Sequence, residues 1–254
     1  MNIAKKISNI IIGFTILIAL WQTIIWVGNY DEALFPPPLK VCKGIWTLIT
    51  TGTLFVHLKV SLIRFFIGYL SAVVSAVILG LILGNLEKLW NIIDPIVQVL
   101  RPISPIAWSP FIVLWFGIGN IPAIMIIFIA AFFPVLLSTV SAVKKVDRTY
   151  LKVAENFEIK QPYLMAKIIF PAAFPFIANG LHLALGTAWI FLVAGEMVGA
   201  QSGLGYLIVD ARNSLSLELV LAGIILIGIL GLILDKAIRL LEKWVEKHWG
   251  NVVK

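Results

Sequence analysis

Five ionisable side chains lie inside long apolar stretches of the sequence, and these residues could act on a solute. They are Arg64, Asp94, Arg101, His182 and Glu196. If the stretches span a membrane, a charged group there is costly and usually faces a partner or a water-filled cavity. The sequence therefore predicts Arg64, Arg101, His182 and Glu196 as candidate residues of a solute pathway.

Each candidate also has a simpler structural interpretation. Arg101 could reach the membrane interface with its long side chain or pair with Asp94, and Arg64 could bind lipid phosphate. His182 could be a packing histidine, and Glu196 could be solvated or could cap the segment that follows it. The sequence alone leaves both interpretations open for all four residues.

Motifs for enzymatic chemistry are missing from the sequence. It contains no G-x-x-x-x-G-K-[ST] phosphate loop and no H-E-x-x-H zinc motif. The three histidines, His57, His182 and His248, are far apart, and Cys42 is the single cysteine. A cysteine-based metal centre and an internal disulfide are therefore excluded. We predict no catalytic residue, no metal and no cofactor, which disfavours a membrane-embedded enzyme.

The composition indicates a membrane protein. Of the 254 residues, 60% are hydrophobic and 13% are charged, whereas soluble domains carry about 25% charged residues. A spanning helix needs about 20 apolar residues. The predicted spans cover residues 7–27, 60–84, 92–118, 121–143, 168–197 and 219–238. The fold class that follows is an all-α integral membrane protein with six transmembrane helices.

Basic residues indicate the orientation of these spans. Most of the 20 Lys and Arg residues fall in the segments that are inside if the N-terminus is inside. Cytoplasmic loops are enriched in such residues, so both termini are predicted to be cytoplasmic. The net charge of +7 is therefore interpreted as topological, and nucleic-acid binding is not expected. In the outer segment, a short interfacial helix is predicted after Phe35-Pro36-Pro37-Pro38.

Small residues recur at helical spacing in the second and fifth predicted spans. They are Ser71, Ala72, Ser75, Ala76, Gly80 and Gly84 in one span, and Ala178, Gly180, Ala184, Gly186 and Ala188 in the other. Stripes of small residues allow the backbones of membrane helices to approach closely. The pattern predicts a tightly packed bundle and does not indicate a substrate.

One inner loop, about residues 144–167, is long enough to fold in the cytoplasm. Asp147 suits a helix N-cap, and Pro162 suits the first turn of a second helix that leads into the fifth span. The apolar residues between them recur at helical spacing: Tyr150, Leu151, Ala154 and Phe157. This apolar face either folds back on the bundle or docks on a partner, and both possibilities stay open.

Four stretches resemble one family. LKVAENFEIKQPYLMAKIIFPAAFP, over Leu151–Pro175, looks like the "EAA" loop of ABC importer permeases. RPISPIAWSPFIVLWFGIG, over Arg101–Gly119, is similar to a segment of the nitrate, taurine, aliphatic-sulfonate and bicarbonate branch. AAFFPV, over Ala130–Val135, and EMVGAQSGLGYLI, over Glu196–Ile208, match the same branch. The chain thus resembles this branch over about residues 58–238.

The resemblance implies an organisation and a set of partners. It implies a type I importer-like permease core over residues 58–241, with a cytoplasmic coupling loop at about 144–167. Residues 1–57 would form an N-terminal spanning helix and an extracytoplasmic segment, and residues 242–254 a cytoplasmic tail. The expected partners are cytoplasmic ATP-binding subunits that carry the ATPase activity, a second permease copy in a homodimer, an extracytoplasmic solute-binding protein and the lipid bilayer of the plasma or inner membrane.

The resemblance also implies coupling residues and a substrate class. The expected contacts with the ATPase are Asp147, Tyr150, Leu151, Ala154, Phe157, Glu158 and Leu164. The branch suggests a small anion such as a sulfonate, nitrate or bicarbonate, while a vitamin precursor or another small heterocycle stays open as an alternative. A stand-alone channel or secondary transporter is disfavoured, because no inverted repeat is visible.

The coupling loop departs from the family motif at two positions. Lys152 stands where the motif has glutamate, and Glu158 stands where it has glycine. Glutamate resists a positive φ angle. We therefore expect the turn at Glu158 to be built differently from the turn of the family.

Overall fold

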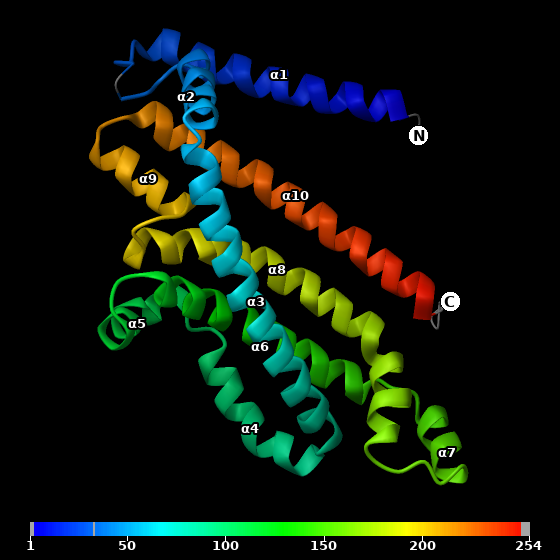
Figure 1. Ribbon diagram of the computed structural model, residues 1–254. Coiled ribbons are helices and arrows are strands. Elements are labelled where there is room, and N and C mark those ends of the chain that lie inside the picture. Colours follow the sequence, from blue (N-terminus) through cyan, green and yellow to red (C-terminus); the bar gives the residue numbers. More distant parts are fainter. Residues whose placement is uncertain (1–2, 33, 250–254) are drawn as a thin grey trace.

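The structure is a computed structural model of the chain, and it describes residues 3–32 and 34–249. The secondary structure of these residues is entirely helical (Figure 1). The elements are α1 Ile3–Gly28, α2 Pro38–Thr50, α3 Thr53–Asn85, α4 Glu87–Leu100, η1 Pro105–Trp108, α5 Ser109–Phe116, α6 Asn120–Lys144, α7 Arg148–Asn156, η2 Met165–Ile169, α8 Phe170–Gly199, α9 Leu204–Asn213 and α10 Leu217–Trp249. The predicted all-α class is confirmed.

Five helical stretches in the described residues are long and apolar enough to cross a membrane. They are Ile11–Gly28, Thr53–Asn85, Asn120–Lys144, Met165–Gly199 and Leu217–Leu240. These stretches coincide with five of the six predicted spans. The last part of the predicted tail, residues 250–254, lies outside the described residues.

The remaining predicted span, residues 92–118, is not one helix. The segments Glu87–Leu100 and Pro105–Phe116 meet at a bend of 85°. Pro102 and Pro105 lie at this break. Proline lacks the N–H of the helical ladder and clashes with the preceding turn, so two prolines within four residues favour a break here. The segment is therefore a broken span or a re-entrant loop, and the chain has six spans if the bent pair counts as one.

Helices α3, α6 and α8 form the centre of the bundle, where small residues bring their backbones together. A Cβ atom placed on Gly80 would lie 2.6 Å from Thr139 Cβ, and one on Gly84 would lie 2.7 Å from Val143 Cβ. Between α6 and α8, a Cβ on Gly180 would collide with Ser138. The predicted stripes of small residues thus contribute to the contacts between α3 and α6 and between α6 and α8.

The two ends of the bundle differ in what they carry. Figure 1 shows α7 at the same end as the start of α1 and the end of α10, whereas α2, α5 and α9 lie at the opposite end. Because basic residues of the α6–α8 loop and of the tail favour the cytoplasm, the α7 end is the inner end. The short helix predicted in the outer segment is α2, whereas α9 was not predicted.

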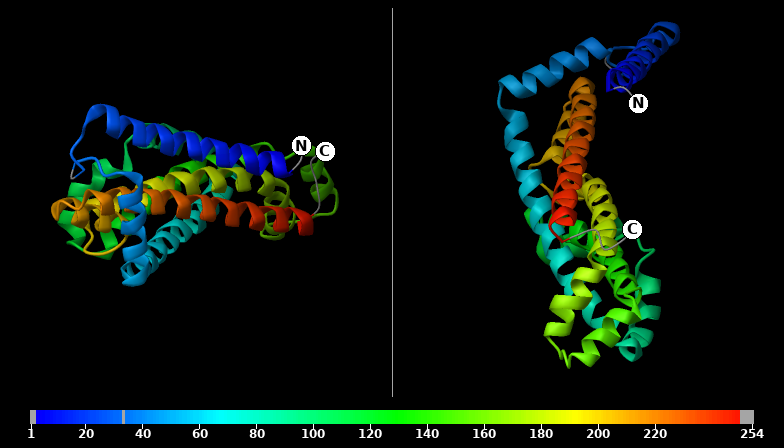
Figure 2. Two further views of the ribbon diagram at one scale, coloured as in Figure 1. Left: turned by 90° about the horizontal axis from the view of Figure 1, so that it is seen from above. Right: turned by 90° about the vertical axis from the view of Figure 1, so that its right-hand side faces the viewer.

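Helix α1 stands beside this bundle and connects to it through α2 (Figures 1 and 2). Its apolar side chains are largely exposed, as Phe14 and Leu17 illustrate at 60% each. Helix α10 instead packs along α8, α9 and α2. The closely packed part of the structure is therefore the α3–α6–α8 core, with α9 and α10 against it.

Replacement of Gly80 by alanine tests the close α3–α6 contact. The added methyl group must displace Thr139, which we expect to destabilise the fold by about 1–3 kcal/mol. Gly228→Ala is the matched control, because a Cβ there meets nothing within 4 Å. The detergent-purified protein is heated, and the fraction that stays folded at each temperature is measured by size-exclusion chromatography. The melting temperature should be lower for Gly80→Ala only. Equal melting temperatures for the two variants would contradict the packing.

Candidate functional site

A buried ion pair joins α3 to α8 near the outer end of the bundle. Arg64 Nη1 lies 2.8 Å from Glu196 Oε1, and the two side chains are 2% and 0% exposed. Glu196 belongs to the last turn of α8, whereas Arg64 lies in the first half of α3. An unpaired charge in such a place would cost several kcal/mol. Each side chain therefore makes the burial of the other possible.

The other polar atoms around this pair are also satisfied. Arg64 Nε and Nη2 donate to Asn120 Oδ1 at 2.9 and 2.6 Å. Arg64 also donates to the Ser202 carbonyl at 2.6 Å and to Ser202 Oγ at 2.9 Å. Ser61 Oγ donates to the Glu196 carboxylate at 2.8 Å. One guanidinium thus connects α3, the start of α6, the end of α8 and the loop before α9.

The same cluster positions the beginning of α9. Glu196 Oε2 accepts the Gly205 N–H at 2.9 Å, and Ser61 Oγ accepts the Leu204 N–H at 2.8 Å. His57 Nδ1 accepts the Gly203 N–H at 3.0 Å. The first N–H groups of a helix have no partner within it, and negative charge is favourable beside them. Glu196 therefore caps α9, which was one of its two structural interpretations, and it is not solvated.

The four predicted pathway residues do not form one site. Arg64 and Glu196 meet each other, and neither is exposed to a solute in this structure. His182 Nε2 on α8 lies 3.1 Å from Asp235 Oδ1 on α10. Arg101 is exposed at the break between α4 and η1. Sequence reasoning recognised the charged residues but not the pairings, because the partners are far apart in the chain.

The proposed pairing of Arg101 with Asp94 is not formed. Asp94 Oδ1 instead accepts a hydrogen bond from Gln98 Nε2 at 3.0 Å, one helical turn away on α4. Arg101 follows the last residue of α4, where the chain turns toward η1. The other structural interpretation of Arg101, with its side chain extended to the membrane interface, stays a prediction.

The loop between α6 and α8 begins as predicted, with a capped helix. Asp147 Oδ1 accepts the N–H of Thr149 at 2.8 Å. This hydrogen bond stabilises the carboxylate and lowers the pKa of Asp147. Helix α7 follows directly, over Arg148–Asn156.

The apolar residues of this loop divide into two groups. Ala154 is 1% exposed, and Leu164 packs on the buried cluster around Ile169. Tyr150 and Phe157 are instead 44% and 75% exposed. Ala154 offers no surface to a partner in this structure, unlike Tyr150 and Phe157, and the role of all three in docking stays a prediction.

The remaining apolar side chains of the loop are also partly or largely exposed. Leu151 is 37% exposed and lines a pocket beside Val143 and Ile169. Val153 and Tyr163, at 47% and 68% exposed, add apolar surface that sequence reasoning missed. One side of the loop thus folds back on the bundle, whereas the other side is uncovered, and docking of that side on a partner stays a prediction.

The turn after α7 corrects the expectation for Glu158. Its φ angle is 53°, in the left-handed region. The Ile159 N–H bonds to the Ala154 carbonyl at 2.9 Å, and the Glu158 N–H bonds to the Glu155 carbonyl at 2.9 Å. These are the two hydrogen bonds of a Schellman motif, which usually has glycine at the left-handed position. The turn therefore has the conformation that glycine would adopt, with glutamate held in it.

Replacing Glu158 by glycine should stabilise this turn. A left-handed residue with a side chain costs about 1–2 kcal/mol, which glycine avoids. Hydrogen exchange of the purified protein should slow at the α7 amides in Glu158→Gly and accelerate in the control Glu155→Gly, because glycine inside a helix is unfavourable by about 1 kcal/mol. Faster exchange in both variants would show that Glu158 makes an interaction of its own.

The comparisons agree with this architecture. Residues 76–247 match the family described as "Binding-protein-dependent transport system inner membrane component". An aliphatic sulfonates transport permease protein of Bacillus subtilis, SsuC, is 36% identical over 93% of this chain and 85% of its own length. The taurine transport system permease protein TauC of Escherichia coli is 31% identical over 98% and 93%.

Two further similarities come from a nitrate permease and a solved structure. The nitrate import permease protein NrtB of Synechocystis is 30% identical over 95% of this chain and 90% of its own length. A structure of the MetNI methionine ABC transporter in an inward-facing conformation superposes with a TM-score of 0.53, at 20% identity, over 78% of this chain and 95% of that one. This last similarity supports the fold alone. The chain therefore belongs to the family of binding-protein-dependent transport system inner membrane components, and it is a multi-pass inner-membrane permease.

Proposed function

We propose that the chain is the membrane-spanning subunit of an ATP-driven importer for a small anion. The observation that carries this proposal is the exposed apolar surface of the α7 loop at the inner end, formed by Tyr150, Val153, Phe157 and Tyr163. Apolar side chains exposed in the cytoplasm need a covering partner. The sequence has no phosphate-binding loop, and we infer that such a partner supplies the energy for transport.

The loop that contains α7 is packed on α6 and is continuous with α8, so a movement of α7 would be transmitted to both helices. Ala154 is buried and Ile169 belongs to the cluster that packs on the end of α6. A π-helical turn, η2, then joins the loop to α8 without an interruption. A force applied to α7 would therefore act on α8 and α6 directly. The partner that we infer at this surface is a cytoplasmic ATP-binding subunit that carries the ATPase activity.

Two further partners follow from the family. Its description names a binding protein, so we infer that an extracytoplasmic solute-binding protein delivers the substrate at the outer end. We also infer a second permease copy, as a homodimer. This is consistent with exposed polar residues in the membrane-spanning parts of α6 and α8, such as Ser141 and Asn179, which lipid would not solvate.

The substrate class rests on the relatives. Those compared above are named for aliphatic sulfonates, taurine and nitrate. Sulfonates and nitrate are small oxyanions, and taurine carries a sulfonate group. We therefore infer that this chain carries a small oxyanion, and no observation in the structure favours a neutral heterocycle instead.

The variant Phe157→Asp tests the docking surface. Loss of an aromatic contact at the centre of an interface commonly costs about 2–4 kcal/mol, so the ATPase activity that co-purifies with the affinity-tagged chain should fall at least about tenfold. Phe157→Leu should retain most of it. The control is Leu215→Asp at the outer end, where the side chain is 82% exposed. Full ATPase recovery with Phe157→Asp, or equal loss with Leu215→Asp, would refute the docking surface.

A further inference from the structure

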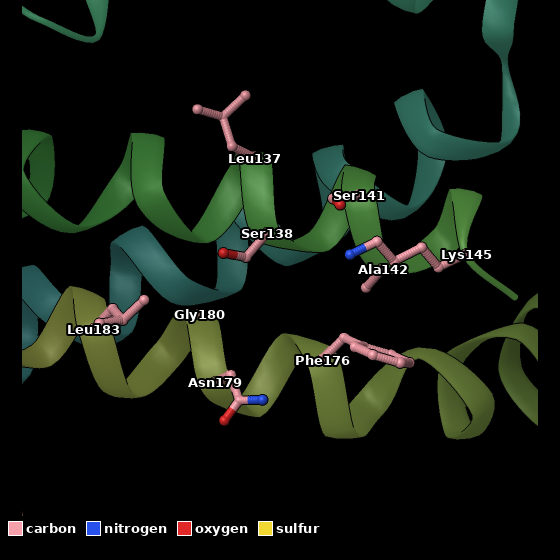
Figure 3. A pocket seen from close by; sticks show the side chains of 9 residues that line it. All are labelled: Leu137, Ser138, Ser141, Ala142, Lys145, Phe176, Asn179, Gly180 and Leu183. Atoms are coloured by element: carbon pink, nitrogen blue, oxygen red, sulfur yellow. The ribbon is translucent and has the colours of Figure 1, made fainter. Parts of the chain in front are cut away.

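A pocket lined by both polar and apolar side chains opens between α6 and α8 in the inner half of the bundle (Figure 3). Its volume is about 320 Å³, which lies at the small end of ligand sites. The residues that line it are Leu137, Ser138, Ser141, Ala142, Lys145, Phe176, Asn179, Gly180 and Leu183. The hydroxyls and the ammonium group come from the α6 side and the amide from α8.

The polar side chains in this pocket differ from other polar side chains in the spans. Thr139 bonds back to the Val135 carbonyl at 2.8 Å, and Ser75 to the Ser71 carbonyl at 2.7 Å. Such bonds to the preceding turn satisfy a hydroxyl within its own helix. In the part of the chain that the structure describes, Ser138, Ser141 and Asn179 make no side-chain hydrogen bond. Their hydrogen-bonding groups are available to a ligand.

This face is unsuited to lipid. Ser141 and Asn179 are exposed in stretches that cross the membrane. Transfer of an amide or hydroxyl to an apolar medium without a hydrogen bond costs about 2–7 kcal/mol. The face must therefore meet water or protein, as the wall of a pathway between two permease copies would.

The charge of the pocket is positive. Lys145 Nζ lies 5.7 Å from the centre of the Phe176 ring, a cation–π contact that holds the ammonium group at the edge of the pocket. No carboxylate is among the lining residues that the structure describes. Arg64, by contrast, is enclosed and neutralised by Glu196. Lys145 is thus a positive charge that a solute in this pocket can meet.

We propose that this pocket, with Ser138, Ser141, Lys145 and Asn179, is a binding site for a small oxyanion. It rests on the proposed function for its place in the pathway, where it would hold the transported anion in the inner half. The ammonium and amide N–H groups and the two hydroxyls are donors, and an oxyanion such as nitrate or a sulfonate presents only acceptors around one negative charge. A cation would meet the positive charge of Lys145 without a compensating carboxylate.

Thiol labelling tests directly whether an anion occupies the pocket. In a Cys42→Ser background, which removes the exposed native thiol, the Asn179→Cys variant of the full complex is reconstituted in phosphatidylcholine vesicles. Nitrate or taurine should slow its modification by a maleimide several-fold, whereas choline should not. The same anions should leave a Ser75→Cys control on α3 unaffected. Equal rates with and without both anions would overturn the proposal.

Two other occupants would give different results. If phosphatidylglycerol in the vesicles slows the labelling of Asn179→Cys and the free anions do not, the pocket binds lipid phosphate and the proposal is wrong. If Asn179→Cys reacts in the detergent-separated chain and never in the complex, a second copy fills the pocket, and the proposal is wrong as well.

Transport measurements supply the second test. Lys145→Met and Asn179→Leu should each lower the uptake of nitrate or taurine by the full complex about tenfold, which corresponds to about 1.4 kcal/mol. Lys144→Met is the matched control, because Lys144 lies over the Trp90 ring on another face of α6. Equal loss of uptake in Lys145→Met and Lys144→Met would contradict the site.

The co-purifying ATPase activity of each variant separates this inference from the proposed function. If no ATPase activity co-purifies with the wild-type chain, the importer assignment fails. Protection of Asn179→Cys by the anions would still show whether they bind in the pocket. If the activity is retained and neither protection nor uptake responds to these residues, only the site fails.

Discussion

The ion pair between Arg64 and Glu196 is the interaction on which the outer half of the bundle depends. Both charges are withdrawn from solvent, with the side chains 2% and 0% exposed, and their desolvation is tolerable only because each compensates the other. Asn120 and Ser202 use the remaining donors of the guanidinium. A single buried cluster thus joins α3, α6, α8 and the start of α9.

The inner half is held in another way. Close contacts at Gly80 and Gly84 join α3 to α6, and no buried ion pair accompanies them in the residues that the structure describes. Contacts of small residues depend on close packing and have no charge that must remain paired. The exposed α7 surface and the pocket between α6 and α8 both belong to this inner half. The outer end is thus joined by a buried ion pair and its hydrogen bonds, whereas the inner end is joined by contacts of small and apolar residues.

The sequence predicted features that depend on local pattern. Apolar length gave the spans, and Asp147 gave the start of α7. The Arg64–Glu196 pair could not be predicted, because 132 residues separate its members and helical periodicity carries no information at that distance. The turn at Glu158 was predicted wrongly because residue preference was given more weight than the two hydrogen bonds of the motif. The pocket was missed because Asn179 is uncharged and Lys145 lies just beyond the end of a span.

A double-mutant cycle on Arg64 and Glu196 tests most directly whether this pair organises the outer half. Arg64→Met and Glu196→Met should each destabilise the detergent-purified protein by about 3–5 kcal/mol, because each leaves an uncompensated buried charge. The double variant removes both charges and should lose clearly less than the sum, with a coupling energy of at least about 2 kcal/mol. Additive losses, or single variants as stable as the wild type, would contradict the central role of the pair.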